Sequence, residues 1–260
     1  MRPSLVFLPL LALIGPTPGD GFAAASARTV VARQSAGRPE PGRPRGFYFS
    51  RSMYTGRGWF PSWTTDYPKA DEQLLTVLRR LMPTLDLSPA LHPIRLDDPD
   101  LRRYPFVYAV EVGHMDLTDA EVAALRAYLA AGGFLMVDDF WGTREWGVFE
   151  REIRRVLPDR AIIDLPISHP IFHTYYDITK VVQVPNVRNA CSGGPTWEQD
   201  GYVPAVRGIL DDSGRLMVLI SWNSDLGDAW EWAEQACYPL AYSTYAFQLT
   251  VNTIVYAMSR

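Results

Sequence analysis

Residues 118–141 constrain the fold of this 260-residue chain more than any other stretch. Thr118 and Glu121 have the spacing of a capping box, in which each side chain bonds a free backbone amide at the start of a helix. Apolar residues then recur at helical spacing, and the pair Gly132 and Gly133 predicts the helix end, because glycine accepts the left-handed backbone of a C-terminal cap. The stretch therefore begins with an amphipathic helix.

A short apolar run at residues 134–137 follows this helix and predicts a strand that is buried on both faces. The strand ends at two consecutive carboxylates, Asp138 and Asp139, before Phe140 and Trp141. A helix that leads into a buried strand is half of an α/β unit, and such folds bind ligands at the carboxyl ends of their strands. The stretch therefore predicts both the fold class and the place of a site.

The same alternation continues on either side of this unit. We expect strands at residues 47–49, 93–96, 105–112, 134–137 and 161–164, and helices at residues 68–82, 118–131 and 146–157. The resulting order, β-α-β-β-α-β-α-β, is typical of a mainly parallel sheet with helices on both faces. We therefore predict a three-layer α/β fold.

The last hundred residues have a different pattern. Residues 202–210 and 215–222 flank a four-residue turn and predict a β-hairpin, and residues 247–258 predict a closing helix with one apolar face. Between these elements we expect short extended pieces at 169–172 and 181–184, a polar loop at 185–201, and an acidic, tryptophan-rich loop at 223–240.

The first 27 residues have the features of a secretory signal peptide. Arg2 precedes an apolar core at residues 5–14, and residues 25–27 form an A-x-A cleavage site. About ten apolar residues are too few to span a bilayer, which needs roughly 20. Residues 28–44 are rich in Arg, Pro and Gly and predict a flexible tether, so we expect a single α/β domain at 45–260. The protein is therefore expected to be exported, periplasmic or secreted, with no transmembrane span once the signal is removed.

The net charge limits the kinds of partner that the domain can bind, and the cysteine content relates to the cellular compartment. The chain has a net charge of −4, and the predicted domain is more acidic still because the tether is basic. Such a domain lacks the basic surface of a nucleic-acid-binding protein, so no nucleic acid is expected as a partner. Cys191 and Cys237 are the only cysteines, and an oxidising compartment would allow them to pair. A disulfide and two free thiols stay open alternatives, because the sequence does not show whether the two Cα atoms approach each other.

Several short motifs follow one another through residues 45–258. They are 47–49 (FYF), Trp63, 66–68 (DYP), 70–71 (AD), 104–106 (YPF), Leu125, 128–133 (YLAAGG), 134–139 (FLMVDD), 169–172 (HPIF), Asp225, Gly227 and Trp230. In this order they resemble a bacterial family catalogued as domain of unknown function 4159. The resemblance implies a fold similar to that of class I glutamine amidotransferases, with no established activity. Members often lie beside genes for MoxR-type ATPases and von Willebrand factor A proteins, which associates the family with assembly or envelope work.

The chain differs from true amidotransferases at the position where those enzymes carry their catalytic cysteine. Those enzymes need a nucleophilic cysteine on a glycine-rich turn between a strand and a helix. Here the corresponding strand ends at Asp138 and Asp139, and the sequence contains no G-x-C-x-G motif. Glutamine amidotransferase activity is therefore not expected.

Asp139, Asp138 and His169 are the candidate catalytic residues. Either aspartate could be a metal ligand, a general base or a hydrogen-bond acceptor for a polyol, or could cap nearby loop amides. Successive strand residues point to opposite faces, so at most one of the two is expected to point into a cleft. His169 could act as a general acid or base, or could be a hydrogen-bonded structural residue.

Acids and aromatic residues elsewhere are the candidate ligand-binding residues. Asp66 and Asp71 bracket a predicted helix start at the same end of the sheet, where the N-cap role is favoured for Asp66 over a ligand role. Aromatic rings stack on apolar sugar faces while carboxylates accept sugar hydroxyls, and tryptophans can equally pack under a loop as a satellite core. The remaining candidates on these grounds are Trp63, Trp141, Asp225 and Trp230.

Three functions remain compatible with these residues. The preferred hypothesis is a non-catalytic module of the bacterial envelope that binds a small polar ligand or a protein partner. The second is a hydrolase or lyase that acts on carbohydrate or another polar substrate through Asp139 or Asp138 with His169. The third is a structural component of a surface complex. No cofactor is evident, although the acids could hold a divalent cation.

Overall fold

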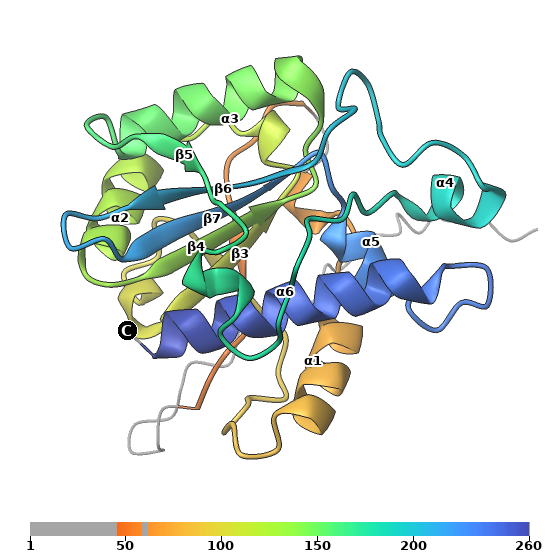
Figure 1. Ribbon diagram of the computed structural model, residues 1–260. Helices are drawn as coiled ribbons and strands as arrows, with labels where there is room; N and C mark the ends of the chain where they lie inside the picture. The colour runs from red at the N-terminus through yellow and green to blue at the C-terminus, as the bar shows by residue number, and fades with distance from the viewer. Residues whose placement is uncertain (1–45, 59–61, 260) are drawn as a thin grey trace, which may run out of the picture. The chain divides into compact units, whose positions relative to one another are not determined.

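The computed structural model describes residues 46–58 and 62–259, so the predicted signal peptide (1–27) and tether (28–44) lie outside the described residues. These residues form a seven-stranded sheet with the order β2-β1-β3-β4-β7-β6-β5 (Figure 1). The strands are β1 Ser50–Met53, β2 His92–Arg95, β3 Phe106–Val110, β4 Phe134–Asp138, β5 Ile162–Asp164, β6 Ala205–Leu210 and β7 Leu216–Trp222. Strands β2, β1, β3, β4 and β7 run parallel, while β6 is antiparallel to both β7 and β5. The predicted α/β fold with a mainly parallel sheet and a C-terminal hairpin is confirmed.

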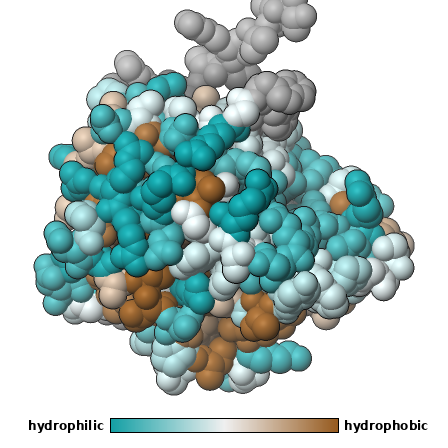
Figure 2. Space-filling view, turned by 90° about the horizontal axis from the view of Figure 1, so that it is seen from above, coloured by the Kyte–Doolittle hydropathy of each residue, from teal (hydrophilic) through white to brown (hydrophobic). Residues whose placement is uncertain are grey.

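Helices cover both faces of this sheet. They are α1 Lys69–Leu81, α2 Asp119–Ala130, α3 Gly142–Val156, α4 Val187–Ser192, α5 Leu226–Glu231 and α6 Leu240–Met258. Helices α2 and α3 pack on one face, and α1, α5 and α6 pack on the other (Figure 1). The outer surface on the α3 side is mostly hydrophilic, with hydrophobic residues in small patches (Figure 2).

Strand β3 contributes side chains to two hydrophobic cores, one on each face of the sheet. All five of its residues are buried. Because side chains alternate along a strand, Phe106 and Tyr108 enter the core under α1 and α6, whereas Val107 and Ala109 enter the core under α2 and α3. Strand β4 is buried in the same way, which confirms the strand predicted at residues 134–137.

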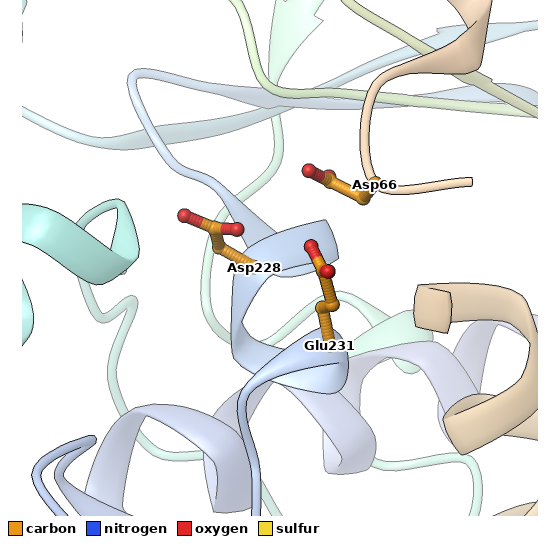
Figure 3. Close-up of side chains that lie close together, drawn as sticks. All are labelled: Asp66, Asp228 and Glu231. Carbon is orange, nitrogen blue, oxygen red and sulfur yellow. The ribbon is translucent and has the colours of Figure 1, made fainter. Parts of the chain in front are cut away.

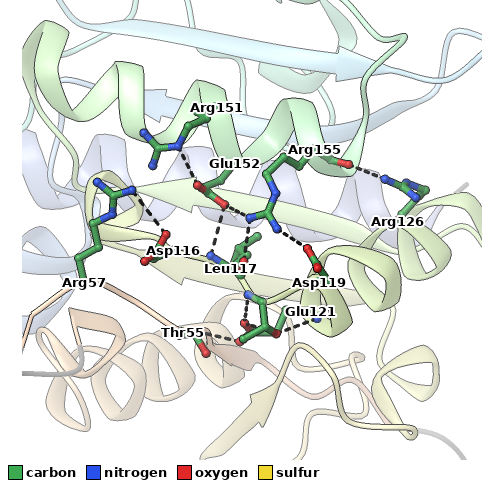
Figure 4. Close-up of polar contacts among 11 residues, drawn as sticks. Thr55, Arg57, Asp116, Leu117, Asp119, Glu121, Arg126, Arg151, Glu152 and Arg155 are labelled. Carbon is green, nitrogen blue, oxygen red and sulfur yellow. Dashed lines mark hydrogen bonds and ion pairs between the residues drawn. The ribbon is translucent and has the colours of Figure 1, made fainter.

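Polar side chains tie the start of α2 to its surroundings (Figure 4). The predicted capping box is present, because Thr118 Oγ1 accepts from the Glu121 amide and Glu121 Oε2 accepts from the Thr118 amide. Glu121 Oε1 also accepts from the Thr55 amide at 2.8 Å. On α3, Glu152 Oε2 accepts from the Leu117 amide at 3.3 Å and from Arg155 at 2.5 Å. These contacts fix the connection between β3 and α2.

Four predictions on local structure were wrong. The first strand begins at Ser50 rather than residue 47, and residues 169–172 contain a 3-10 helix at Pro170–Phe172 in place of an extended piece. The two predicted loops contain the short helices α4 and α5, which begin at the side-chain caps Asn186 and Asp225. Six residues are too few to display a helical hydrophobic period, so capping and packing decide these helices.

Cys191 and Cys237 form a disulfide, with their Cα atoms 4.8 Å apart. The bond joins α4 to the segment between α5 and α6, and it settles the alternative that the sequence left open. Within residues 46–259, none of the described helices is long and apolar enough to cross a membrane.

Candidate functional site

A cavity of about 380 Å³ lies at the carboxyl end of the parallel strands; we call it the acidic cavity. Seven carboxylates line it, namely those of Asp66, Glu111, Asp139, Glu145, Glu198, Asp225 and Asp228. Among the described lining residues, His114 is the only one with a basic side chain, and none is lysine or arginine. The cavity therefore has a strongly negative potential whenever its acids are ionised.

The sheet order brings four of these acids together. Asp66 lies in the loop after β1, Glu111 follows β3, Asp139 follows β4 and Asp225 lies just after β7. These four strands are parallel neighbours, so their carboxyl ends meet at one edge of the sheet, where open α/β folds bind ligands. Acids that are far apart in the sequence thus converge because the strands carry them to the same place.

Backbone conformation sets the cavity apart from the rest of the domain. Asp66, Glu111, Asp139 and Gln199 have φ angles of 62°, 55°, 51° and 49°. They are four of the five described non-glycine residues with positive φ, and all four line the cavity. Such conformations cost about 1–3 kcal/mol each and gather at functional sites, where the surroundings enforce them.

The two consecutive aspartates at the end of β4 have different surroundings. Asp138 is fully buried, and its Oδ2 accepts from the amides of Leu226 and Gly227 at 2.8 and 3.1 Å and from the Tyr108 hydroxyl at 3.2 Å. Asp138 therefore positions the start of α5 and does not line the acidic cavity. Asp139 lies in the cavity, and its Oδ1 accepts from Trp141 Nε1 at 2.9 Å.

Asp66, Asp139 and Asp225 each offer a carboxylate oxygen to one cluster, in which these oxygens lie within 4.8 Å of one another. Asp139 and Asp225 are only 6% and 4% exposed. Their Oδ1 atoms accept hydrogen bonds from Trp141 Nε1 and from the Asp228 amide. Oδ2 of Asp66 is buried and has no partner among the described residues. Buried polar atoms are normally satisfied, so this oxygen indicates a missing ligand.

A second group of acids shares Asp66. Figure 3 shows that Asp228 and Glu231, both from α5, lie close to the Asp66 carboxylate. Lys69 Nζ lies 3.7 Å from Glu231 Oε1, so this group has a partial counter-charge. The cluster of Asp66, Asp139 and Asp225 lacks a comparable contact among the described residues and is the stronger candidate for binding a cation.

Burial and mutual repulsion raise the pKa values of the cavity acids. Burial is the main cause for Asp66, Asp139 and Asp225, whose pKa values lie well above the usual range, and neighbouring carboxylates add to each shift. Burial, followed by repulsion from Glu145, raises the pKa of Glu111 to about 8. Burial also raises the pKa of Asp138 to about 7. Without a cation, the cavity therefore holds protons at neutral pH.

These pKa values predict how stability depends on pH in the absence of divalent cations. A carboxylate with a raised pKa binds more protons in the folded state, so its contribution to stability is complete below the unfolded pKa and is lost as pH rises through the folded pKa. Burial lowers the pKa of His92 from 6.5 to about 4, so the contribution of His92 to stability opposes this trend below pH 6.5. The pKa of Glu111 is about 8. The loss of stability with rising pH should therefore be clearest between pH 6.5 and 8.

We expect the melting temperature, measured with a chelator present, to fall as pH rises across this window. Asp139→Asn removes one of the repelling charges, so its melting temperature should fall less steeply than that of the wild type. A melting temperature that rises between pH 6.5 and 8 would contradict the raised pKa values of the cavity acids.

Several of the predicted site residues lie outside the acidic cavity. Asp71 is buried against Arg51, and Trp63 packs its ring on Tyr67. Trp230 is fully buried against Phe49 and Tyr108, so the alternative that it is a core residue agrees with its position. The His169 ring accepts from the Ile171 amide at 3.2 Å and caps the 3-10 helix.

Three other predicted residues do line the cavity. They are Asp66, Trp141 and Asp225, together with Asp139. The N-cap role favoured for Asp66 was wrong, because α1 has Pro68 at its N-cap and no side chain caps the helix. The ligand role that was weighed against it is consistent with the position of Asp66.

Sequence reasoning missed other cavity residues. Glu111 directly follows β3 just as Asp139 follows β4, but the strand predicted at residues 105–112 included Glu111, so the rule for strand ends did not find it. Glu145 lies in the first turn of α3, and Glu198 and Gln199 lie in a long loop. The sequence gives no pattern that links these three residues to the strand ends.

The fold and the site together define an α/β domain with a carboxylate-lined cavity at the carboxyl end of its sheet. A family model described as Domain of unknown function (DUF4159) matches residues 54–258, and the chain belongs to this family. The matched span includes all seven carboxylates of the acidic cavity. A search of curated proteins finds no match to the chain.

Proposed function

We propose that this domain is a non-catalytic binding module that holds a divalent cation in the acidic cavity and uses it to bind a small polar ligand. The observation that carries this proposal is the cluster of carboxylate oxygens from Asp66, Asp139 and Asp225, in which Asp66 Oδ2 is buried and has no hydrogen-bond partner among the described residues. A cation would neutralise these acids and replace the protons that they otherwise hold at neutral pH.

The donor set favours a hard cation such as Ca²⁺, Mg²⁺ or Mn²⁺. The three ligands offer only carboxylate oxygens, which suit these ions, whereas zinc prefers histidine and thiolate. Both cysteines are in the disulfide, and His114 is the only described histidine that lines the cavity. Since Ca²⁺ takes about 6–8 oxygen ligands, three carboxylates leave positions that hydroxyl groups of a ligand can fill.

A titration with CaCl₂, MgCl₂ and MnCl₂ on the full chain, freed of metal by a chelator, tests this proposal. A cation present at about 100 times its Kd stabilises the folded state by roughly 2.7 kcal/mol, which raises the melting temperature. Asp139→Asn and Asp225→Asn keep the side-chain size but remove a ligand charge, so each should abolish this increase while raising the melting temperature of the cation-free protein.

Asp212→Asn is the matched control for these variants. Asp212 is exposed in the turn between β6 and β7, away from the acidic cavity, so this variant should retain the full response to the cation. Equal responses in the wild type, Asp139→Asn and Asp225→Asn, or no response to any of the three cations, would refute the proposed cation site.

Hydrolysis of a bound saccharide is the second candidate function, and one observation favours it. Glu111 has a pKa raised to about 8, which suits a general acid, and its Oε2 lies 3.5 Å from His114 Nε2. Release of reducing ends that Glu111→Gln abolishes would support this candidate. Export to the envelope and the class I glutamine amidotransferase-like fold, which come from the N-terminal segment and the family resemblance, remain part of the proposal.

A further inference from the structure

The loop between α4 and β6, whose backbone is seen in Figure 1, carries exposed aromatic residues next to residues that line the acidic cavity. Glu198 and Gln199 of this loop line the cavity. Trp197 and Tyr202, on either side of them in the sequence, are 40% and 62% exposed. Their rings contact each other, with centroids 5.7 Å apart and planes at 67°. We call this pair the aromatic platform.

Side-chain hydrogen bonds hold the loop at six positions. Each of these bonds joins a loop residue to a residue outside the loop. The pairs are Thr196 with Gln183, Glu198 with Asn186, Gln199 with Glu145, Asp200 with Thr143, Gly201 with Gln183, and Val203 with Asn223. The platform therefore stands on a fixed backbone before any ligand binds.

Two glycines allow this loop to lie so close to the sheet and to α3. A Cβ added at Gly142, which has φ 67°, would lie 1.9 Å from Asp200 Oδ1. A Cβ at Gly201 would lie 2.5 Å from Asn223 Oδ1. The loop is thus pressed against the start of α3 and the end of β7, which are the elements that border the cavity.

We infer that the aromatic platform binds one face of a saccharide whose hydroxyl groups reach the acidic cavity. This inference rests on the proposed function and names its ligand class. A sugar ring has an apolar face that stacks on an aromatic side chain, and its hydroxyl groups can donate hydrogen bonds to carboxylates or coordinate a bound cation through their oxygens. One loop supplies both kinds of contact, because Glu198 and Gln199 line the cavity while Trp197 and Tyr202 form the platform.

The size of the exposed apolar surface favours a small ligand over a protein partner. A stable protein interface buries about 800 Å² on each partner and has an apolar centre. In the loop between α4 and β6, the large exposed hydrophobic side chains of the described residues are Trp197, Tyr202 and Val203. The aromatic platform is therefore of a size that suits one or two sugar units.

Binding of the full chain to a glycan microarray in the presence of Ca²⁺, followed by calorimetry on the best glycan, tests this inference. We expect Trp197→Ala and Tyr202→Ala each to weaken glycan binding by about tenfold, since one stacked ring is lost. Ca²⁺ affinity should stay within about twofold of the wild type, because neither side chain belongs to the proposed cation cluster. Tyr175→Ala is the matched control, because Tyr175 is 53% exposed, between Trp197 and Tyr202, but lies outside the loop between α4 and β6, and it should leave glycan binding unchanged.

The outcomes separate this inference from the proposed function. Calcium binding without binding to any glycan overturns the inference alone, as does glycan binding that survives both platform variants. Binding of a poly-lysine peptide that requires Trp197 would overturn the saccharide assignment in favour of a cationic ligand. Glycan binding that needs Trp197 but occurs without any affinity for Ca²⁺, Mg²⁺ or Mn²⁺ would overturn the cation proposal and leave the platform in place.

Discussion

Replacing Arg51 by methionine is expected to lower the free energy of unfolding by about 3–5 kcal/mol, because it leaves a buried carboxylate without its counter-charge. Arg51 and Asp71 are both fully buried, and the Arg51 guanidinium contacts Asp71 through Nε at 3.0 Å and through Nη2 at 2.5 Å. Its Nη1 also donates to the backbone oxygens of Thr65 and Trp63, at 2.9 and 3.3 Å. One side chain on β1 thus fixes both the start of α1 and the loop that carries Asp66.

Urea unfolding at neutral pH measures this loss, and the double variant Arg51→Met/Asp71→Leu is its control. Replacing both members of a buried ion pair by apolar side chains is often nearly neutral, so the double variant should be clearly more stable than Arg51→Met alone. Both variants leave the Thr65 carbonyl without its donor, and we expect both to bind the cation more weakly because Asp66 is the next residue. A loss below about 1 kcal/mol for Arg51→Met would show that Asp71 is not a buried, ionised partner.

The central α/β unit could be predicted because its sequence signals are local and agree with one another. The capping box at Thr118 and Glu121, the glycine pair after α2 and the apolar run of β4 each point to the same helix and strand. The carboxyl end of β4 was therefore a reasonable place to expect a site, and Asp139 lies in the acidic cavity there.

The composition of the cavity could not be predicted in the same way, because it depends on which strands are neighbours. Strand β7 inserts beside β4, although some 77 residues separate them in the sequence, and this pairing brings Asp225 next to Asp139. Periodicity does not encode strand order, so Asp225 was predicted only from its acidic, aromatic surroundings. The burial of Trp230 and the ion pair of Asp71 are likewise decided by packing between distant elements.

Replacing both Cys191 and Cys237 by serine is expected to lower the free energy of unfolding by about 4 kcal/mol, because the bond closes a loop with a sequence separation of 46. The closed loop contains β6, β7 and α5, so the cross-link restricts a large part of the unfolded chain. Urea unfolding with and without a reductant measures the effect. The reduced wild type should match the double serine variant, and that variant should not respond to the reductant. Equal stability of the oxidised and reduced wild type would contradict the expectation.

Measuring the cation affinity of the double serine variant shows whether the disulfide affects only the unfolded chain or also the shape of the folded cavity. Helix α4 is also held to α5 by the Val187 amide, which donates to Asp228 Oδ2 at 2.6 Å. The Tyr238 hydroxyl adds a second contact by donating to the Pro185 carbonyl at 2.9 Å. Because these contacts remain when the disulfide is absent, the folded cavity should keep its shape. We therefore expect the double serine variant, studied well below its melting temperature, to bind the cation as tightly as the wild type. A weaker affinity would mean that the bond also holds α4 against the acidic cavity, through Asn186 and Asp228.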